Sequence, residues 1–486
     1  MDAIQRLNDA IAKAASGNDT YDTYKPHWQY LLESYLGGEE YRRAEHLVKY
    51  QLETESEYQS RLRTTPLDNH CASVISVYNS FLFRTEPERE LGAIENTFEV
   101  QDFLEDADFD GRSLNSFMKD VSTWSSVFGH CWVIVAKADV DATTLADEQA
   151  QGVRPYLSVL TPLVVLDWHW QRSASGRFTL AFLKYIEDVN ENVHTIKEWR
   201  PESIRTIVVN MEDDIIESDE IVPNGLGKIP AVCVYNKKGV VKGIGISDIG
   251  DIADAQRFIY NATSEIDQSI RLDSHPSLVK TPETNAGIGA GSIIHMPDNL
   301  DPGLKPYVIE FSGASVDKIL GAITHTIGSI DKMANTGAVR ATESRTMSGV
   351  AMETEFQLLN AKLSEKADQL ELAEEQIWQL WCDYAGIQWQ GAIEYPGSFN
   401  IRDTGSEIAQ LKMASEAAPN NAQVQKAVAM QVLDWMEVDY DEETMTQMEE
   451  FQPHIMTDPV TGESRTVQSQ QEHLELAAQG WIHQGE

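Results

Sequence analysis

One long helical pattern constrains the fold of this chain more than any other feature. Residues 350–384 contain neither Pro nor Gly. Their apolar residues recur at spacings of three and four, which places them on one stripe of a helix, and Lys, Asp and Glu fill the intervening positions. Gly386 stands where the residue after a helix C-terminus belongs. At about 1.5 Å per residue, the predicted helix is roughly 50 Å long, well above the average for a globular domain.

Two shorter helices are predicted before it, at residues 247–272 and 315–334, each with an isoleucine-rich stripe and a serine at its start. Between them, residues 276–313 are dense in Gly and Pro and contain short strand-like runs at 277–281, 292–296 and 307–311. After the second helix, residues 335–348 are small, polar and weakly basic. A structureless loop of this length between two helices is uncommon, and is usually functional or disordered.

The remainder of the chain reads as a mixture of helices and strands. Residues 25–87 predict helical pieces, and strand-like runs follow at 156–160, 163–168, 178–186, 193–199, 204–209 and 229–235. Near the C-terminus, residues 407–417 and 421–436 predict helices. From residue 427 to residue 464 there is no Lys or Arg, against ten Asp and Glu, which is typical of a solvated face. The tail from residue 453 is rich in Gln and Ser, and we expect it to be partly disordered, with a terminal helix at 474–481.

The order of helix, strand-bearing insert, helix, polar loop and long helix resembles the portal proteins of tailed double-stranded-DNA bacteriophages. Residues 347–352 resemble the family's usual start of the long helix, and residues 161–168 and 225–232 look like segments of its wing. The resemblance implies an α+β portal fold. Its parts would be a flexible N-terminus (1–24), the wing (25–245), the first stem helix (246–275), the clip (276–313), the second stem helix (314–334), the tunnel loop (335–349), the long radial helix with the rest of the wing (350–400), and a helical crown with the C-terminal tail (401–486).

Three groups of candidate site residues follow from this assignment. The tunnel-loop residues expected to face DNA are Arg340, Thr342, Arg345 and Thr346. The clip residues expected to dock partners are Lys280, Gly289, His295 and Lys305. The stem residues expected to pack between subunits are Ile259, Ile266, Ile323 and Ile327, because a narrow two-helix element cannot bury its apolar stripes alone.

Two interpretations of the loop arginines remain open. Arg340 and Arg345 are either exposed side chains that pair with Glu343 or a neighbouring copy, or weak contacts to passing phosphates.

The resemblance also implies a function. Portal proteins assemble as a closed ring of about twelve copies at one capsid vertex, where the ring is the conduit through which the genome is packaged and ejected. Implied partners are viral double-stranded DNA, the terminase packaging motor, a head–tail adaptor, and the major capsid protein or scaffold. The implied locations are the virion and, during assembly, the bacterial host cytoplasm. The alternatives are another ring-forming head–tail structural or adaptor protein, and a metal-dependent enzyme.

The net charge limits how the chain can interact with nucleic acid. The formal net charge is −39, so the chain does not attract nucleic acid through its net field. The acidity fits either an ordinary acidic protein or a surface along which DNA slides.

The sequence lacks the motifs of common enzyme classes. We find no phosphate-binding loop, zinc helix or nucleophile elbow, and expect no catalytic residue, cofactor or metal. Residues 106–111 imitate half of a calcium loop, but Phe117 occupies the position of its bidentate acid. Four scattered cysteines predict free thiols, and no apolar run reaches the ~18 residues that a membrane helix needs.

Overall fold

The structure is a computed structural model that describes residues 16–95, 97–138, 151–213, 215–274, 277–280, 285–286, 294–296, 298–299, 301–309, 314–340, 349–399, 411–415, 417, 422–435, 454–459, 461–467, 476 and 479–483. The chain divides into two compact units, Met1–Phe399 and Asn400–Glu486. Both contain helices and antiparallel strands, so the α+β class is confirmed.

The first unit begins with helices. They are α2 (Asp19–Leu36), α3 (Gly38–Arg43), α4 (Glu55–Thr64), α5 (His70–Leu82), α6 (Phe98–Glu105) and α7 (Leu114–Phe128). The last part of the expected flexible N-terminus (1–24) is helical instead, because α2 starts at Asp19 with a side-chain cap from Asn18, while residues 1–15 lie outside the described residues. The Asn18 amide also donates to Asp167 Oδ1 at 2.8 Å, which fixes the start of the helix to a strand far along the chain.

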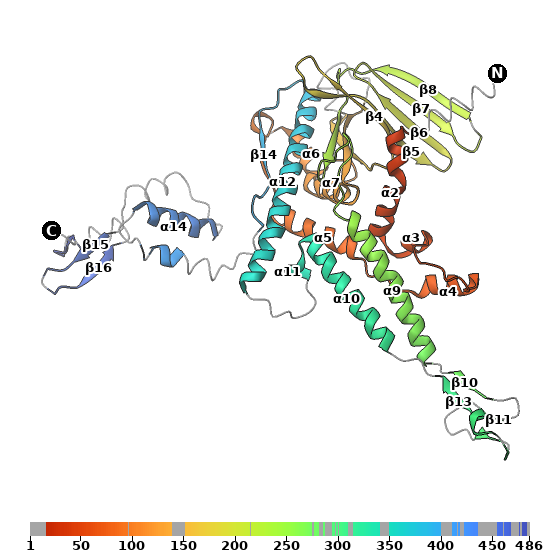
Figure 1. Ribbon diagram of the computed structural model, residues 1–486. Helices are drawn as coiled ribbons and strands as arrows, with labels where there is room; N and C mark the ends of the chain where they lie inside the picture. Colours follow the sequence, from red (N-terminus) through yellow and green to blue (C-terminus); the bar gives the residue numbers. More distant parts are fainter. Residues whose placement is uncertain are drawn as a thin grey trace. The chain divides into compact units, whose positions relative to one another are not determined.

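Two antiparallel sheets follow (Figure 1). The order of the first is β3-β2-β9, with β2 (His130–Lys137), β3 (Pro155–Leu160) and β9 (Ala231–Tyr235). The second is a five-stranded meander of β4 (Val165–Arg172), β5 (Phe178–Asn190), β6 (Val193–Trp199), β7 (Ser203–Asn210) and β8 (Ile215–Pro223). All six predicted strands of this region are present. Strand β8 was not predicted; it is an edge strand with most residues exposed, so its sequence lacks the alternation that burial on one face imposes.

Helix α12 (Gly349–Ala385) is the predicted long helix. Gly386 adopts φ +68°, and the Ile387 amide donates to the Cys382 carbonyl at 2.9 Å, which is a Schellman termination. Helix α12 packs against β2, β9 and α5, and its stripe from Leu359 to Trp381 belongs to the main core. A short sheet of β1 (Glu88–Glu90) and β14 (Ala392–Glu394) covers another side of it.

Two charged residues of helix α12 that its sequence assigns to a solvated face, Lys366 and Glu374, are buried, while Glu365 and Asp368 are exposed as predicted. The side chain of Glu374 is fully buried, its Oε1 lies 2.5 Å from Arg89 Nε, and its Oε2 accepts a hydrogen bond of 2.7 Å from the Tyr395 hydroxyl. Lys366 is also buried. The prediction was wrong at these positions because the helix is covered on more than its apolar side.

Helices α9 (Gly250–Ser274) and α10 (Ala314–Ala334) form a hairpin, which we call the stem hairpin (Figure 1). The segment between them contains β10 (Ser277–Val279), β11 (Asn285–Ala286), β12 (Ile294–His295) and β13 (Tyr307–Ile309). Strands β10 and β13 pair with each other, as do β11 and β12, so the insert contains two small hairpin-like pairs. The predicted order of helix, strand-bearing insert and helix is therefore confirmed.

The second unit differs from the expected helical crown. Helix α14 (Ala422–Trp435) agrees with the prediction, but β15 (His454–Thr457), β16 (Ser464–Val467) and β17 (Ile482–His483) form an antiparallel sheet in the order β16-β15-β17. Met456, Val467 and Leu476 form its small core, with Trp481 packed against them. The Gln/Ser-rich composition concealed these strands.

Candidate functional site

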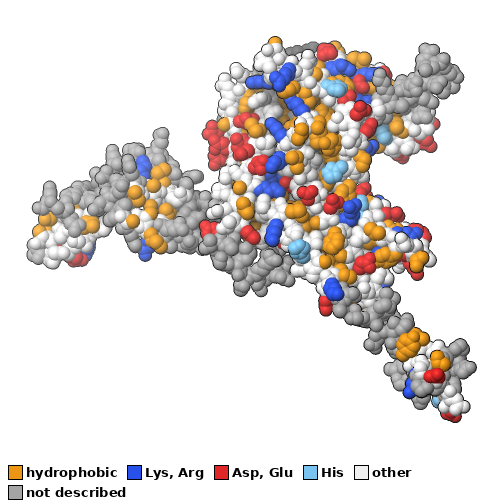
Figure 2. All heavy atoms as spheres, in the orientation of Figure 1, with side chains coloured by type: hydrophobic (Ala, Val, Ile, Leu, Met, Phe, Trp, Pro, Cys, Tyr) orange, Lys and Arg blue, Asp and Glu red, His pale blue; other side chains and the backbone are white. Residues whose placement is uncertain are grey.

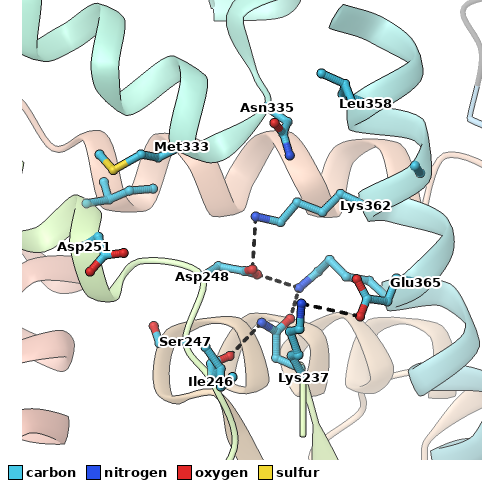
Figure 3. Close-up of a pocket in the computed structure, with 14 residues that line it drawn as sticks. Lys237, Ile246, Ser247, Asp248, Asp251, Met333, Asn335, Leu358, Lys362 and Glu365 are labelled. Carbon is cyan, nitrogen blue, oxygen red and sulfur yellow. Dashed lines mark hydrogen bonds and ion pairs between the residues drawn. The ribbon is translucent and has the colours of Figure 1, made fainter. Parts of the chain in front are cut away.

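The stem hairpin, helix α12 and the end of β9 meet at a hollow of about 460 Å³ (Figure 3). Its lining residues are Asn236, Lys237, Ile246, Ser247, Asp248, Asp251, Ile252, Met333, Asn335, Leu358, Ala361, Lys362, Glu365 and Lys366. They come from the segment that leads into α9, from the end of α10 and from the first half of α12. This junction therefore sets the orientation of the stem hairpin relative to the long helix.

Asp248 is the centre of the junction. Its Oδ2 lies 2.7 Å from Lys366 Nζ and its Oδ1 lies 3.2 Å from Lys362 Nζ. Lys366 also donates to Ser126 Oγ at 2.8 Å and to Asn236 Oδ1. Figure 3 shows the Lys362 side chain reaching from α12 toward Asp248. A buried carboxylate is tolerated only with such partners, so the network holds three distant segments together.

The ionisation of this network follows from its surroundings. Burial alone would raise the pKa of Asp248. Lys366 and Lys362 have the larger, opposite effect, so the pKa is about 2, below the ordinary value of 3.8. Burial lowers the pKa of Lys366, although Asp248 opposes this effect. The Asp248 carboxylate is therefore ionised near neutral pH, with two lysine side chains beside it.

The residues before α9 are fixed by their own hydrogen bonds. Ser247 Oγ donates to the Val127 carbonyl at 2.6 Å, and the Asp248 amide donates to the Ser126 carbonyl at 3.0 Å. The Ile249 amide donates back to Ser247 Oγ at 3.0 Å. Ser247 thus forms a turn before the helix, and α9 begins three residues later than the sequence predicts.

Two glycines allow the chain to pass close to the wing at this point. A Cβ atom on Gly245 would lie 1.8 Å from the Gly129 carbonyl oxygen, and Gly129 itself adopts φ +88°. The Gly245 amide donates to His130 Nδ1 at 3.3 Å. Neither position has room for a side chain, so the two backbone segments cross in close contact here.

Helix α10 ends beside the same hollow. Asn335 adopts φ +57°, and the Thr336 amide donates to the Asp331 carbonyl at 2.9 Å, so the helix terminates in a Schellman motif. The Tyr78 hydroxyl donates to the Ala334 carbonyl at 2.5 Å and anchors this end to α5. The chain leaves the stem hairpin at a fixed point.

The first part of the expected tunnel loop is a helical turn, α11 (Gly337–Arg340), instead of a structureless segment. The Arg340 side chain is only 12% exposed, with Nη1 lying 3.0 Å from Asp331 Oδ1 and Nη2 lying 2.8 Å from His70 Nδ1. Burial and the neighbouring Arg340 lower the pKa of His70, which keeps its ring neutral and able to accept. The expectation of an exposed Arg340 was wrong for this chain on its own. Thr342, Arg345 and Thr346 lie outside the described residues.

The stem positions differ in burial along the hairpin. Ile259 is fully buried, Ile323 and Ile327 pack partly buried against the main core, and Ile266 is half-buried. Toward the end of the hairpin that carries the insert, the apolar side chains are more exposed: Ile270 is 52% and Leu320 47% exposed. Packing of these residues between subunits remains a prediction.

The clip positions are at the surface where they are described. Lys280, His295 and Lys305 are exposed, and Gly289 lies outside the described residues. Leu304 and Tyr307 add exposed apolar area, at 53% and 56%. Docking of partners here remains a prediction.

In the part of the chain that the structure describes, no group of three or more His, Cys, Asp or Glu side chains could hold a metal ion. The residues that imitate a calcium loop form a turn, in which the Asp108 carboxylate accepts from the Asp110 amide and from Arg112. All four cysteines are free. Among the described helices, none combines the length and apolar character of a membrane span.

Comparisons with known proteins complete this description. No family model and no curated protein matches the chain. Among solved structures, it is similar to a chain from the virion of a native gene transfer agent particle, with 12% identity over 80% of this chain and 97% of the other, and a TM-score of 0.44. Two more are from the neck of such particles: one from the empty particle in C6 symmetry (11% identity, 75% and 91% covered, TM-score 0.47), and one from the native particle in C12 symmetry (10% identity, 74% and 89% covered, TM-score 0.42).

Proposed function

We propose that the chain is one subunit of a portal-type ring that conducts double-stranded DNA at a capsid vertex. The observation that carries the proposal is the stem hairpin. The apolar side chains of its two helices become more exposed to solvent with distance from the wing. Ile270 is 52% and Leu320 47% exposed, whereas Ile259, nearer the wing, is 2% exposed. Figure 2 shows hydrophobic side chains at the surface of this region. Exposed apolar stripes on a narrow element are typical of an interface between subunits.

The hairpin also presents a receptor for a neighbouring side chain. A largely apolar hollow of about 370 Å³ lies between α9 and α10, lined by Phe258, Ala262, Ile319 and Ala322 among others. A neighbouring hairpin that inserts an apolar side chain there would make a head-to-tail contact. Such contacts produce a closed ring when the rotation between copies closes. We propose about twelve copies, as the resemblance implies.

The other parts of the chain take the roles that a conduit needs. We propose that the clip, with Lys280, His295 and Lys305 exposed, docks the packaging motor and later the head–tail adaptor. We propose that the tunnel loop (335–349), which includes Arg345, contacts the passing DNA. The net charge of −39 disfavours tight DNA binding, which suits a channel through which DNA must slide. The ring would be built in the host cytoplasm, together with the capsid or scaffold protein, and kept in the virion.

Electron microscopy of the purified protein tests the proposal. We expect closed rings with a central hole, and a shift of the monomer to the ring as concentration rises. A monodisperse monomer across the whole accessible concentration range would contradict the proposal. Turnover of ATP or DNA that a point substitution in this chain abolishes would favour the enzyme alternative.

A further inference from the structure

A group of cations lies on the turn between β9 and α9 and on the neighbouring end of β4. We call Arg172, Phe178, Lys238, Val240 and Lys242 the basic hook. Lys242 Nζ lies 3.3 Å from the centroid of the Phe178 ring, and the Arg172 guanidinium carbon lies 4.5 Å from the same centroid. Val240 is fully exposed to solvent. The hook therefore combines positive charge with exposed apolar surface.

The basic hook is held rigidly. Trp168 Nε1 donates to the Lys242 carbonyl at 3.2 Å, and the Gly243 amide donates to the Tyr235 hydroxyl at 2.9 Å. Lys238 and Gly245 form a β-bridge across the base of the turn. A preformed surface loses little conformational freedom on binding, which favours a docking role.

The cations of the hook lack acidic partners within the described part of the chain. Lys237, just before the hook, lies 4.0 Å from Glu365, but no described carboxylate pairs with Arg172, Lys238 or Lys242. Burial, Arg172 and Lys238 together lower the pKa of Lys242, as expected of a cation among cations. In a chain with 77 acidic and 38 basic residues, three neighbouring cations with no carboxylate partner among the described residues indicate a surface that meets an acidic partner.

An acidic surface lies on the opposite edge of the same sheet. We call Glu212, Ile215, Glu217, Glu220 and Ile221 the acidic edge, which comprises one residue of the turn before β8 and four residues of β8. Ile221 is 66% and Ile215 49% exposed. Strand β8 pairs only with β7 among the described strands, so its outer backbone groups are available. The strand carries both kinds of side chain that the hook would meet, carboxylates for its cations and isoleucines for its valine. Consecutive residues such as Glu220 and Ile221 lie on opposite faces of the sheet, so the hook would dock on the rim of the edge strand.

The sheet order sets the relation between the two surfaces. In the order β4-β5-β6-β7-β8, the hook packs on β4 and the acidic edge is β8, so they lie at opposite edges of the sheet (Figure 1). The four gaps between these strands, at about 4.8 Å each, separate the two edges by roughly 19 Å. Two complementary surfaces on opposite edges of one unit allow each copy to contact two neighbours in the same sense.

We infer that the basic hook of one copy docks on the acidic edge of the next copy. The inference rests on the proposed ring and adds the contact between adjacent wings. A nucleic acid is a poorer partner for the hook, because three cations release few counterions while the acidic chain repels a polyanion. The contact is electrostatic and exposed, so it weakens as salt screens it.

Charge reversal tests the inference. The hook variant Lys238→Glu/Lys242→Glu places carboxylates against carboxylates, and the edge variant Glu217→Lys/Glu220→Lys places cations against cations. Each variant alone should form rings with an apparent affinity about tenfold lower or worse. An equimolar mixture should recover ring formation, because the copies can alternate: wild-type hook meets wild-type edge, and reversed hook meets reversed edge. Lys119→Glu, an exposed lysine on α7, is the matched control and should assemble normally.

The outcomes separate the inference from the proposed function. Recovery in the mixture supports the inference and also shows that both variants fold. As a second measurement, Val240→Cys and Ile221→Cys in the same chain should give oxidised dimers and longer ladders. If the wild type forms rings and both variants form them equally well, the hook–edge contact is wrong while the portal proposal stands. If the wild type forms no rings and the cysteine pair forms no cross-links, both fail.

Discussion

Lys366 Nζ lies 2.7 Å from Asp248 Oδ2, which joins the middle of helix α12 to the residue that leads into the stem hairpin. The two residues are 118 positions apart in the sequence, and both side chains are buried. Because Lys362 approaches the other carboxylate oxygen, the contact resists rotation as well as separation. Any movement of the stem hairpin relative to the long helix must therefore break these ion pairs or move their residues together.

Removing the lysine should destabilise the subunit strongly. Lys366→Met leaves Asp248 buried with Lys362 alone, so we expect the free energy of unfolding to fall by about 3 kcal/mol. Urea denaturation followed by fluorescence measures this change. Lys237→Met is the control, because Lys237 is exposed and its ion pair with Glu365 is long, at 4.0 Å. We expect this control to change the free energy of unfolding by less than about 0.5 kcal/mol. Equal effects of the two substitutions would contradict the role assigned to the buried network.

Asp248 should make the subunit sensitive to acid. Its pKa in the folded chain is about 2, below the ordinary value of 3.8, so its ionisation stabilises the fold above about pH 4. That stabilisation, about 2 kcal/mol, is lost as pH falls from 4 toward 2. We expect the difference in unfolding free energy between wild type and Asp248→Asn to narrow over this interval. A difference that stays constant from pH 5 to pH 2.5 would contradict it.

Arg340 should contribute to the stability of the isolated subunit. Arg340→Ala removes the ion pair with Asp331 and the hydrogen bond to His70, so we expect a loss of about 1–3 kcal/mol. Arg271→Ala removes a pair of similar geometry in which the arginine is 47% exposed, and should cost less than about 1 kcal/mol. Thermal unfolding of the two variants compares them. An unchanged melting temperature for Arg340→Ala would restore the expectation of a free loop arginine.

Substitutions on the stem hairpin should separate assembly from folding. Leu320→Asp changes an exposed side chain, so we expect ring yield to fall while the melting temperature of the subunit is kept. Ile323→Asp should lower both, because Ile323 packs against the core of its own chain and the new charge would be buried. We expect Ile266→Asp, at a half-buried position, to lower ring yield. Light scattering and calorimetry provide the two measurements. Full ring yield for Leu320→Asp would remove this face from the interface.

The glycine crossing should tolerate no side chain. Gly245→Ala would place a methyl group 1.8 Å from the Gly129 carbonyl oxygen, so the backbone must shift, at a cost of about 3 kcal/mol or more. Gly225→Ala is the matched control, because a Cβ there meets no atom within 4 Å. We expect Gly225→Ala to keep the wild-type melting temperature. Similar melting temperatures for the two variants would show that the crossing opens easily.

The sequence predicts elements well where the determinants are local. The bounds of α12 follow from an unbroken periodicity and from Gly386, both of which act within a few residues. The start of α9 is less accurate because Ser247 donates to a distant carbonyl, and nothing nearby in the sequence reveals this. Strand β8 has no buried face to impose a pattern.

The candidate site is harder to predict than the elements. Lys366 and Glu374 occupy positions that a helical wheel assigns to solvent. Their partners Asp248 and Arg89 are 118 and 285 residues away in the sequence. A single sequence contains no signal for such pairs. The one available hint is that α12 is too long to lie on the surface of a domain of this size without being covered on several sides.

The pairing of β10 with β13 has a consequence for how the clip can change. The register places Val279 opposite Tyr307 and Ser277 opposite Ile309, so the chain enters and leaves the insert side by side. A different insert joined at these two strand ends would leave the stem hairpin and the buried charges of the junction unaltered. The insert can thus be exchanged or diversified on its own, without any change to the two helices that carry it.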